Sequence, residues 1–308
     1  MAAMAWQTTG DVTEFLAAAG AYLRRERVRN TVILSVTETM RVNAAVSAGR
    51  SPSSAGRPDS APADGVAGQA ARPLFGWWSD PAGAVAGAFM HTPPFPVVLT
   101  AVARDAAAVL VAVTMAARPL GGVNAYPEVA EAFADGWRDG NRGGRVDVHR
   151  RQRLYRLSEL VWPDPAPAGA ARMADDADAK LTADWFAAFI DEVDDMGKGE
   201  DQSAAAREKI RHAGVMLWEA DGDPVSIACN TMPVSGMVRI GPVYTPPEAR
   251  GHGYASAATA ALSQRLLEAG AEEVVLFTDL ANPVSNSIYQ RIGYRPIEDR
   301  VVLAFSAD

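Results

Sequence analysis

Two glycines, Gly251 and Gly253, give the clearest chemical signal in this 308-residue chain, because they fall between a predicted strand and a predicted helix. Glycine lets the backbone turn tightly and lets a ligand approach the main chain. The first N–H groups of a helix have no partner within the helix and carry a partial positive charge. The segment therefore predicts an anion site, most naturally one for phosphate.

Two known phosphate-binding patterns fit this segment poorly. A nucleotide P-loop needs a lysine beside its last glycine, and no lysine follows Lys209 in the sequence. The dinucleotide fingerprint needs a third small residue and an acid about 20 residues further on. It is approximated by Gly251, Gly253, Ser256 and Glu272 or Glu273. Because Pro246 to Arg250 separate the loop from the strand, a nucleotide-dependent oxidoreductase is a weak alternative.

A second candidate site follows about 30 residues along the chain. Asn282 precedes Pro283, and asparagine as N-cap with proline in the first turn predicts a helix start. Tyr289 follows Asn282 at an interval of about two helical turns. Both side chains are therefore expected on one side of this helix.

Alternating strands and helices position both candidate sites. A strand at 238–245 ends at two prolines, which cannot donate to a ladder. The helix after the loop runs to Gly270, with apolar residues every three or four positions. A buried strand at 274–277 precedes the second helix, which ends at Gly293. The pattern is typical of an α/β domain.

These two segments together resemble the general N-acetyltransferase (GNAT) superfamily. The loop Arg250-Gly-His-Gly-Tyr-Ala255 matches the Arg/Gln-x-x-Gly-x-Gly/Ala pattern of its acetyl-CoA pyrophosphate loop. Asn282, Tyr289 and Gly293-Tyr294 match its second motif in order and interval. The resemblance extends over roughly residues 170–308.

The resemblance implies an N-acetyltransferase that transfers acetyl from acetyl-CoA, its cosubstrate, to a primary amine by direct attack. The backbone of Val243, Tyr244 and Thr245 would bind the pantetheine as an added strand. The other cofactor-binding residues would be Arg250, Gly251, His252, Gly253, Tyr254, Ala255, Ser256 and Asn282. Tyr289 would be catalytic, as the proton donor to the departing thiolate.

Acidic residues supply further candidates in this half. The general base stays open among Glu219, Glu248 and Asp279. Phe277 stands at the strand position where some relatives carry glutamate. Four more acids end a predicted helix at 181–193 or follow it: Asp191, Glu192, Asp194 and Asp195. Since negative charge opposes the helix dipole there, they indicate either recognition of a cationic amine or a solvated acidic surface.

The N-terminal half repeats the same rough order of elements. A predicted strand at 31–39 precedes a polar loop at 49–70, and strands and helices alternate after it. No glycine lies at 102–106, where this half would need its phosphate loop. Tyr126 follows Asn124 by two residues, too close for the second motif. We interpret this half as a degenerate GNAT-like domain that binds no CoA.

The expected fold class is α/β (α+β), with two GNAT-like domains that each form a mixed, mostly antiparallel sheet flanked by helices. At this length about two domains are expected. The degenerate domain is predicted at 1–162 and the catalytic acetyltransferase domain at 171–308. The linker between them, 163–170, carries three prolines, which make it semi-rigid.

Composition narrows the class of protein further. A single cysteine, Cys229, suits a cytoplasmic location and excludes an internal disulfide framework. The four histidines lack metal-ligand spacing, so no metal is expected. Arg104 and Asp105 interrupt the longest apolar stretch, and neither a membrane span nor a nucleic-acid motif is expected.

Two function classes stay open on the sequence. The first is the N-acetyltransferase, whose partner would be a small-molecule or peptide amine. The second is a non-catalytic module that binds or senses acyl-CoA, because both motifs concern the cofactor. Neither the acceptor nor the oligomeric state follows from the sequence.

Overall fold

The computed structural model describes residues 5–49, 72–141, 144–193 and 199–306. Its N-terminal half contains, in chain order, β1 (Trp6–Thr9), α1 (Val12–Arg25), α2 (Thr31–Gly49), β2 (Leu74–Ser79), β3 (Val85–His91), β4 (Val97–Leu99), α3 (Arg104–Ala117), β5 (Gly122–Ala125), α4 (Pro127–Gly140) and β6 (Arg145–Leu157). No helix within the described residues is long and apolar enough to cross a membrane.

The C-terminal half repeats this order and adds two short 3-10 helices, η1 and η2. It contains β7 (Ala170–Met173), η1 (Asp176–Asp178), α5 (Ala179–Glu192), α6 (Ser203–Arg211), β8 (Val215–Ala220), β9 (Asp223–Asn230), β10 (Met237–Tyr244), η2 (Pro247–Ala249), α7 (Tyr254–Glu268), β11 (Glu273–Asp279), α8 (Pro283–Arg291) and β12 (Tyr294–Ser306).

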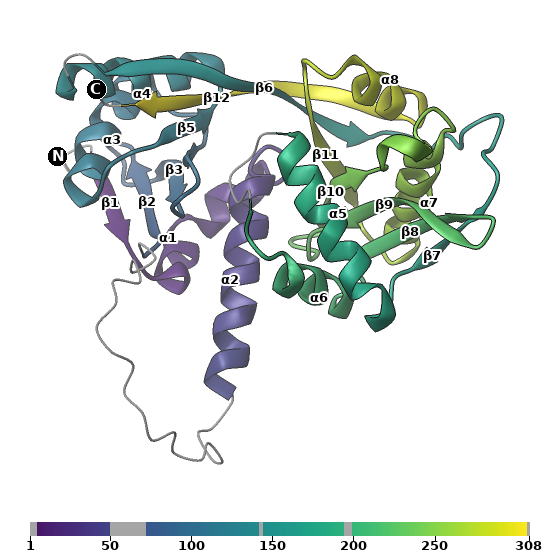
Figure 1. Cartoon of the computed structure of the whole chain (residues 1–308). Helices are drawn as coiled ribbons and strands as arrows, with labels where there is room; N and C mark the ends of the chain where they lie inside the picture. The colour runs from purple at the N-terminus through teal and green to yellow at the C-terminus, as the bar shows by residue number, and fades with distance from the viewer. Residues whose placement is uncertain (1–4, 50–71, 142–143, 194–198, 307–308) are drawn as a thin grey trace, which may run out of the picture.

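All these strands form one sheet, in the order β1-β2-β3-β4-β5-β12-β6-β11-β10-β9-β8-β7. β4 pairs with β5, and β10 with β11, in parallel, whereas the remaining described pairs are antiparallel. Helices flank the sheet in both halves (Figure 1). The mixed α/β fold with a mostly antiparallel sheet is therefore confirmed, and the two halves share a single sheet.

The two halves exchange segments of their last strands. β12 lies between β5 and β6, and its residues 301–304 pair with β5. β6 in turn lies between β12 and β11, and its residues 152–156 pair with β11. Figure 1 shows these two long strands running together from one half to the other. Each half is thus completed by a strand segment that belongs to the other half of the sequence.

Side chains follow these strands into the opposite core. Val301, Leu303 and Phe305 belong to the core of the N-terminal half, where Phe305 stacks on Trp137 with ring centroids 4.7 Å apart. Tyr155 of β6 is fully buried in the core of the C-terminal half. Burying a large apolar side chain contributes about 1.5 to 3 kcal/mol. The exchange therefore couples the folding of the two halves.

The strand predicted at 31–39 is wrong, because this segment begins helix α2. Its Val, Ile and Thr residues favour strands when each is considered alone. In the helix, however, Ile33 and Leu34 are buried in a core that also contains Leu154 and Met237 from the strands. Packing against distant parts of the chain overrides the local preference.

The division of the chain at 1–162 and 171–308 stays a prediction. β7 begins at Ala170, which closes the predicted linker. The loop predicted at 49–70 lies outside the described residues apart from Gly49, which ends α2. Because β6 and β12 are exchanged, a cut in the linker would not yield two complete sets of strands.

Candidate active site

β10 and β11 are paired over only part of their length. Their parallel pairing stops at Ile240 and Leu276, although both strands continue for several residues. On its other side β10 stays paired with β9 through Val243 and Tyr244. The end of β10 therefore presents one backbone edge that no described strand occupies. An extended ligand can bind such an edge as an added strand.

The loop between β10 and α7 turns through the two glycines, with φ of +84° at Gly251 and +83° at Gly253. Gly253 is the N-cap of α7, and no side chain caps this helix end. The amide of Ala257 donates to the Gly253 carbonyl oxygen and begins the helical ladder. The amides of the first three residues of α7 have no such partner, so they are free to bind an anion.

Side chains of this loop stabilise it without using those amides. Arg250 donates from Nε to the Thr245 carbonyl oxygen at 2.9 Å and forms an ion pair with Glu192 of α5 at 2.6 Å. His252 is exposed, and its ring stacks on that of Tyr254 with centroids 5.4 Å apart. The main-chain donors therefore remain available to a ligand.

Two other predicted cofactor residues have buried side chains. Tyr244 packs in the core beneath α5 and α6, with the Arg250 guanidinium 5.9 Å from its ring centroid. Ser256 is buried within α7. Val243 is partly buried and packs in the core beside α7. These residues can contribute to a ligand site mainly through their backbone.

Asn282 and Tyr289 both lie on α8, in different surroundings. Asn282 is the exposed N-cap, and its Oδ1 accepts a hydrogen bond from the Ser285 amide at 3.0 Å. Its side-chain amide nitrogen has no partner among the described residues. Tyr289 is buried, and its ring meets that of Tyr294 edge-on at 6.1 Å. The helix thus presents one polar group to solvent and one phenol to the core.

Burial raises the pKa of Tyr289 to about 12. An ordinary phenol has a pKa of about 10 and an ordinary thiol about 8.5. Tyr289 is therefore protonated at neutral pH and can donate a hydrogen bond. Because it is a weaker acid than a thiol, it would stabilise a departing thiolate by hydrogen bonding more readily than by complete proton transfer.

The three candidate bases lie in different places. Glu219 forms an ion pair with Arg172 at 2.7 Å near the β7 edge of the sheet. Glu248 is exposed in η2. Asp279 ends β11 beyond its pairing with β10, and its Oδ1 accepts a hydrogen bond from the Ala281 amide at 2.8 Å. Of the three, only Asp279 lies on a strand that borders the unoccupied edge of β10.

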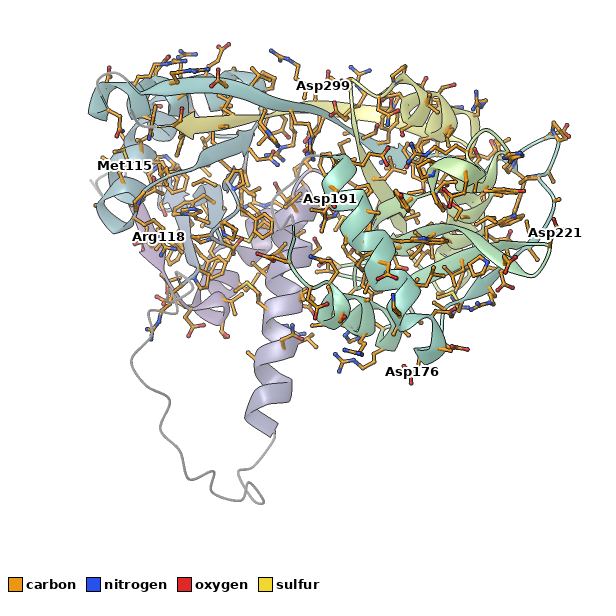
Figure 2. The ribbon with its side chains drawn as sticks, in the orientation of Figure 1. Met115, Arg118, Asp176, Asp191, Asp221 and Asp299 are labelled. Atoms are coloured by element: carbon orange, nitrogen blue, oxygen red, sulfur yellow. The ribbon has the colours of Figure 1, made fainter. Side chains whose placement is uncertain are left out.

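The acidic cluster at the end of α5 is only partly described. Asp194 and Asp195 lie outside the described residues. Glu192 is engaged with Arg250, whereas Asp191 is exposed on α5 (Figure 2). Recognition of a cationic amine by this cluster stays a prediction.

Other reactive groups offer little in the part of the chain that the structure describes. No group of His, Cys, Asp and Glu there is arranged to hold a metal ion. Cys229 is buried, and burial raises the pKa of its thiol to about 12. Its thiolate is therefore scarce at neutral pH, which makes it a poor nucleophile.

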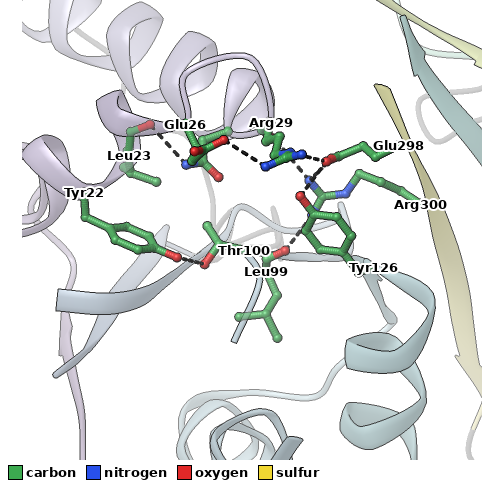
Figure 3. Close-up of polar contacts among 10 residues, drawn as sticks. Tyr22, Leu23, Glu26, Arg29, Leu99, Thr100, Tyr126, Glu298 and Arg300 are labelled. Carbon is green, nitrogen blue, oxygen red and sulfur yellow. Dashed lines mark hydrogen bonds and ion pairs between the residues drawn. The ribbon is translucent and has the colours of Figure 1, made fainter. Parts of the chain in front are cut away.

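In the N-terminal half the corresponding place is occupied by side chains (Figure 3). β4 and β5 also pair in parallel over a short stretch, and each strand ends one residue after the pairing. There the carbonyl oxygen of Leu99 accepts a hydrogen bond from Arg300 of β12 at 2.5 Å. Glu298 lies beside Arg300, accepts a hydrogen bond from Tyr126 at 2.6 Å and forms an ion pair with Arg29 at 3.1 Å. Arg300 is buried and Arg29 is exposed, and together with Glu298 and Tyr126 they occupy the end of β4.

The helix starts of the two halves differ as well. α3 follows Ala103, which has a φ of −62°, and its first residue Arg104 forms an ion pair with Asp135 at 2.9 Å. α4 has Tyr126 as its N-cap residue, where α8 has Asn282. Both helices continue with proline, so the local fold is retained while the polar group has changed.

Arg239 and Lys209 were not singled out from the sequence. Arg239 projects from β10 to the face opposite its neighbours Val238 and Ile240, which pack in the core beside α7. Its Nη2 donates to the Ser35 hydroxyl of α2 at 2.9 Å. The available signal was an arginine inside an apolar strand, where strand alternation places it on the other face.

The geometry agrees with a comparison against protein families. Residues 172–294 match the model of the acetyltransferase (GNAT) family. This part of the chain is therefore a GNAT domain, of a family whose fold supports acetyl-CoA-dependent acetyl transfer. The predicted resemblance is confirmed, and no curated protein matches the chain in sequence.

Solved structures extend the likeness of the fold. A Drosophila protein aligns over 99% of both chains, with a TM-score of 0.63 and 14% identity. A GCN5-related N-acetyltransferase from Kribbella flavida covers 72% of this chain and 87% of its own, with a TM-score of 0.50 and 21% identity. One from Sphaerobacter thermophilus covers 75% and 80%, with a TM-score of 0.50 and 17% identity. At these identities the likeness concerns the fold, and it includes the arrangement of both halves.

Proposed function

We propose that the C-terminal half is an N-acetyltransferase that transfers acetyl from acetyl-CoA to a primary amine. The observation that carries this proposal is the unoccupied backbone edge of β10 next to the uncapped start of α7. The edge would bind the pantetheine through residues 243–245, and the amides beside Gly251 and Gly253 would bind the pyrophosphate. The exposed amide group of Asn282 would bind the cofactor from α8.

The chemistry is one displacement at the thioester. The amine nitrogen attacks the carbonyl carbon, a C–N bond forms, the C–S bond breaks, and the sulfur leaves with the electron pair. Tyr289 would stabilise the thiolate by donating its phenolic hydrogen bond. The protonated amine gives up one proton before attack, to Asp279 directly or through water. The nitrogen loses its second proton as the C–S bond breaks, and the departing thiolate takes up this proton through water.

The base is needed because most of the amine is protonated at neutral pH. An alkyl ammonium with a pKa of about 10.4 must lose a proton before attack, which costs about 5 kcal/mol at pH 7. Asp279 is the proposed acceptor of this proton because it ends β11 beside the free edge of β10. A cytoplasmic location follows only as an expectation from the single cysteine.

Two measurements test the proposal. Calorimetric titration with acetyl-CoA, CoA and NADH should show binding of the first two and none of NADH. An acceptor screen that detects free thiol should then find an amine whose acetylated product is confirmed by mass. Binding without thiol release for every amine would favour a non-catalytic acyl-CoA module, and binding of NADH alone would exclude both.

A further inference from the structure

One enclosed pair of cations remains without a carboxylate partner. Arg239 lies on β10, two residues before the point where this strand has left β11. Lys209 on α6 donates to the Asn230 carbonyl oxygen at 3.0 Å, at the neighbouring end of β9. Within the described residues, neither side chain has a carboxylate oxygen within ion-pair distance.

The guanidinium of Arg239 is incompletely paired. Its Nη2 donates to Ser35 of α2, and its Nε is shielded from solvent without any hydrogen-bond partner. Burial lowers the pKa of Arg239 to about 10, so the group is still charged at neutral pH. Desolvating a charge without a counter-charge is costly, and buried cations are ordinarily paired. The Nε of Arg300 is shielded and unpartnered too, but Arg300 has the Glu298 carboxylate beside it. What sets Arg239 apart is the missing counter-charge, which a ligand anion would supply.

The position of Arg239 suggests that the anion it binds is part of the acetyl acceptor. Val238 and Ile240 face α7, the helix that starts at the proposed phosphate site, whereas Arg239 faces α2 on the other side of the sheet. Strand geometry places its Cα only about 7 Å from the first residue of β10 that no longer pairs with β11. A group bound by Arg239 would thus lie beside the proposed thioester, on the face that the cofactor phosphates do not use.

We propose that Arg239, assisted by Lys209, binds the carboxylate of the acceptor, which is therefore an amino acid or another short amine that carries a carboxylate. This inference rests on the proposed acetyltransferase function and narrows its substrate class. Two parallel N–H donors of a guanidinium match the two oxygens of a carboxylate. Lys209 adds a flexible amine donor. Burial lowers its pKa, and a bound carboxylate would favour its charged form.

The test compares amines that differ in the carboxylate. Glycine is paired with ethylamine, and β-alanine with propylamine, in steady-state assays of thiol release. The wild type should prefer the carboxylated member by at least about tenfold in kcat/KM, equivalent to about 1.4 kcal/mol. Arg239→Gln should remove most of this preference through KM, with kcat and the rates of the amines that lack a carboxylate nearly unchanged. Arg239→Lys should restore part of it.

A matched variant controls for loss of charge and for folding. Arg27→Gln removes one positive charge from a neighbouring site, where Arg27 pairs with Glu272 at 2.7 Å and donates to the Ser235 carbonyl oxygen. This variant should keep the carboxylate preference. If Arg239→Gln lowers kcat/KM equally for both members of each amine pair, Arg239 serves only to hold α2 against β10. That result would overturn the proposal.

A binding measurement separates this inference from the enzyme activity. N-acetylglycine and N-ethylacetamide are titrated into the protein with CoA present, so no turnover is required. Tighter binding of N-acetylglycine that is lost in Arg239→Gln supports the carboxylate site even if every amine fails as a substrate. If amines are acetylated but neither the kinetics nor the binding shows a preference for the carboxylate, the acetyltransferase function is supported and the carboxylate site is contradicted.

Discussion

The two halves share a strand arrangement, but its free backbone edge is open in one half and covered by a side chain in the other. In each half the parallel pairing of two neighbouring strands stops and a helix begins nearby. In the C-terminal half the strand edge is unoccupied and the helix starts at Gly253, which has a positive φ. In the N-terminal half Arg300 donates to the Leu99 carbonyl oxygen, and α3 starts without a glycine. If the cofactor binds along the free edge of β10 as we propose, a single arginine from a distant strand is enough to cover the equivalent backbone in the other half.

The halves also differ in how an arginine with a shielded Nε is neutralised. Arg300 has Glu298 beside it, in a cluster completed by Tyr126 and Arg29. Arg239 has a hydroxyl and no carboxylate. Side chains of the protein thus compensate the charge in the half that we interpret as structural. In the proposed catalytic half the compensation is left to a ligand.

The largest effect is expected from the residue that the C-terminal strand inserts into the N-terminal core. Phe305→Ala removes a ring that stacks on Trp137 and Phe133. Phe to Ala changes in cores cost about 3 to 5 kcal/mol, and denaturant unfolding with tryptophan fluorescence would measure the loss. Val284→Ala, an exposed change on α8, is the control and should cost under about 0.5 kcal/mol. A cost below 1 kcal/mol for Phe305→Ala would contradict the exchange of core residues.

The next effect concerns the pair that occupies the N-terminal site. Glu298→Gln leaves Arg300 buried without a carboxylate and should destabilise the protein by about 3 kcal/mol. The double change Glu298→Leu with Arg300→Met should recover much of this loss, which thermal unfolding would detect. Acetyl-CoA should still bind at one site per chain in the double variant, because α3 offers no glycine loop. A second site would show that the side chains alone suppress binding in this half.

Tyr289 tests the chemistry assigned to the C-terminal half. Tyr289→Phe should lower kcat by about 10- to 1000-fold while acetyl-CoA still binds, because a thiolate can leave without a proton donor. Stopped assays of thiol release with saturating cofactor would measure this. A change in cofactor affinity with kcat preserved would instead make Tyr289 a packing residue.

The same variant has a predicted pH signature. The pKa of Tyr289 is raised from about 10 in an unfolded chain to about 12 in the folded protein. Its contribution to stability is therefore complete below pH 10 and is lost as the pH rises towards 12, by about 2 to 3 kcal/mol. Tyr289→Phe should lose less stability than the wild type over this interval. Identical alkaline unfolding curves would show that the phenol is not desolvated.

The smallest predicted effect is on cofactor affinity. Gly253→Val should weaken acetyl-CoA binding by about tenfold or more, or about 1.4 kcal/mol, because a side chain would crowd the amides at the start of α7. Gly270→Val is matched for strain, since Gly270 has a φ of +91° at the other end of the same helix. Calorimetry should show normal affinity in this control. Equal affinity in both folded variants would remove the loop from the site.

Much of the C-terminal half could be predicted from local sequence. The glycine loop, the Asn-Pro helix start and the apolar periods around them are short-range patterns, so each element was predicted close to its observed place. The family match at 172–294 then confirmed the domain type. The strand prediction for 31–39 was wrong because this helix is stabilised by contacts with Leu154 and Met237. These residues are far away in the sequence, so local patterns do not reveal them.

By itself the sequence determined the donors that a phosphate site needs, since positive-φ glycines and an uncapped helix start are properties of consecutive residues. Only the tertiary structure decided which half keeps its strand edge open. Arg300 reaches Leu99 because β12 crosses into the other half, and Arg239 meets Ser35 because α2 packs across the sheet. Such contacts depend on strand order and on desolvation, which arise only when residues far apart in the chain are packed together.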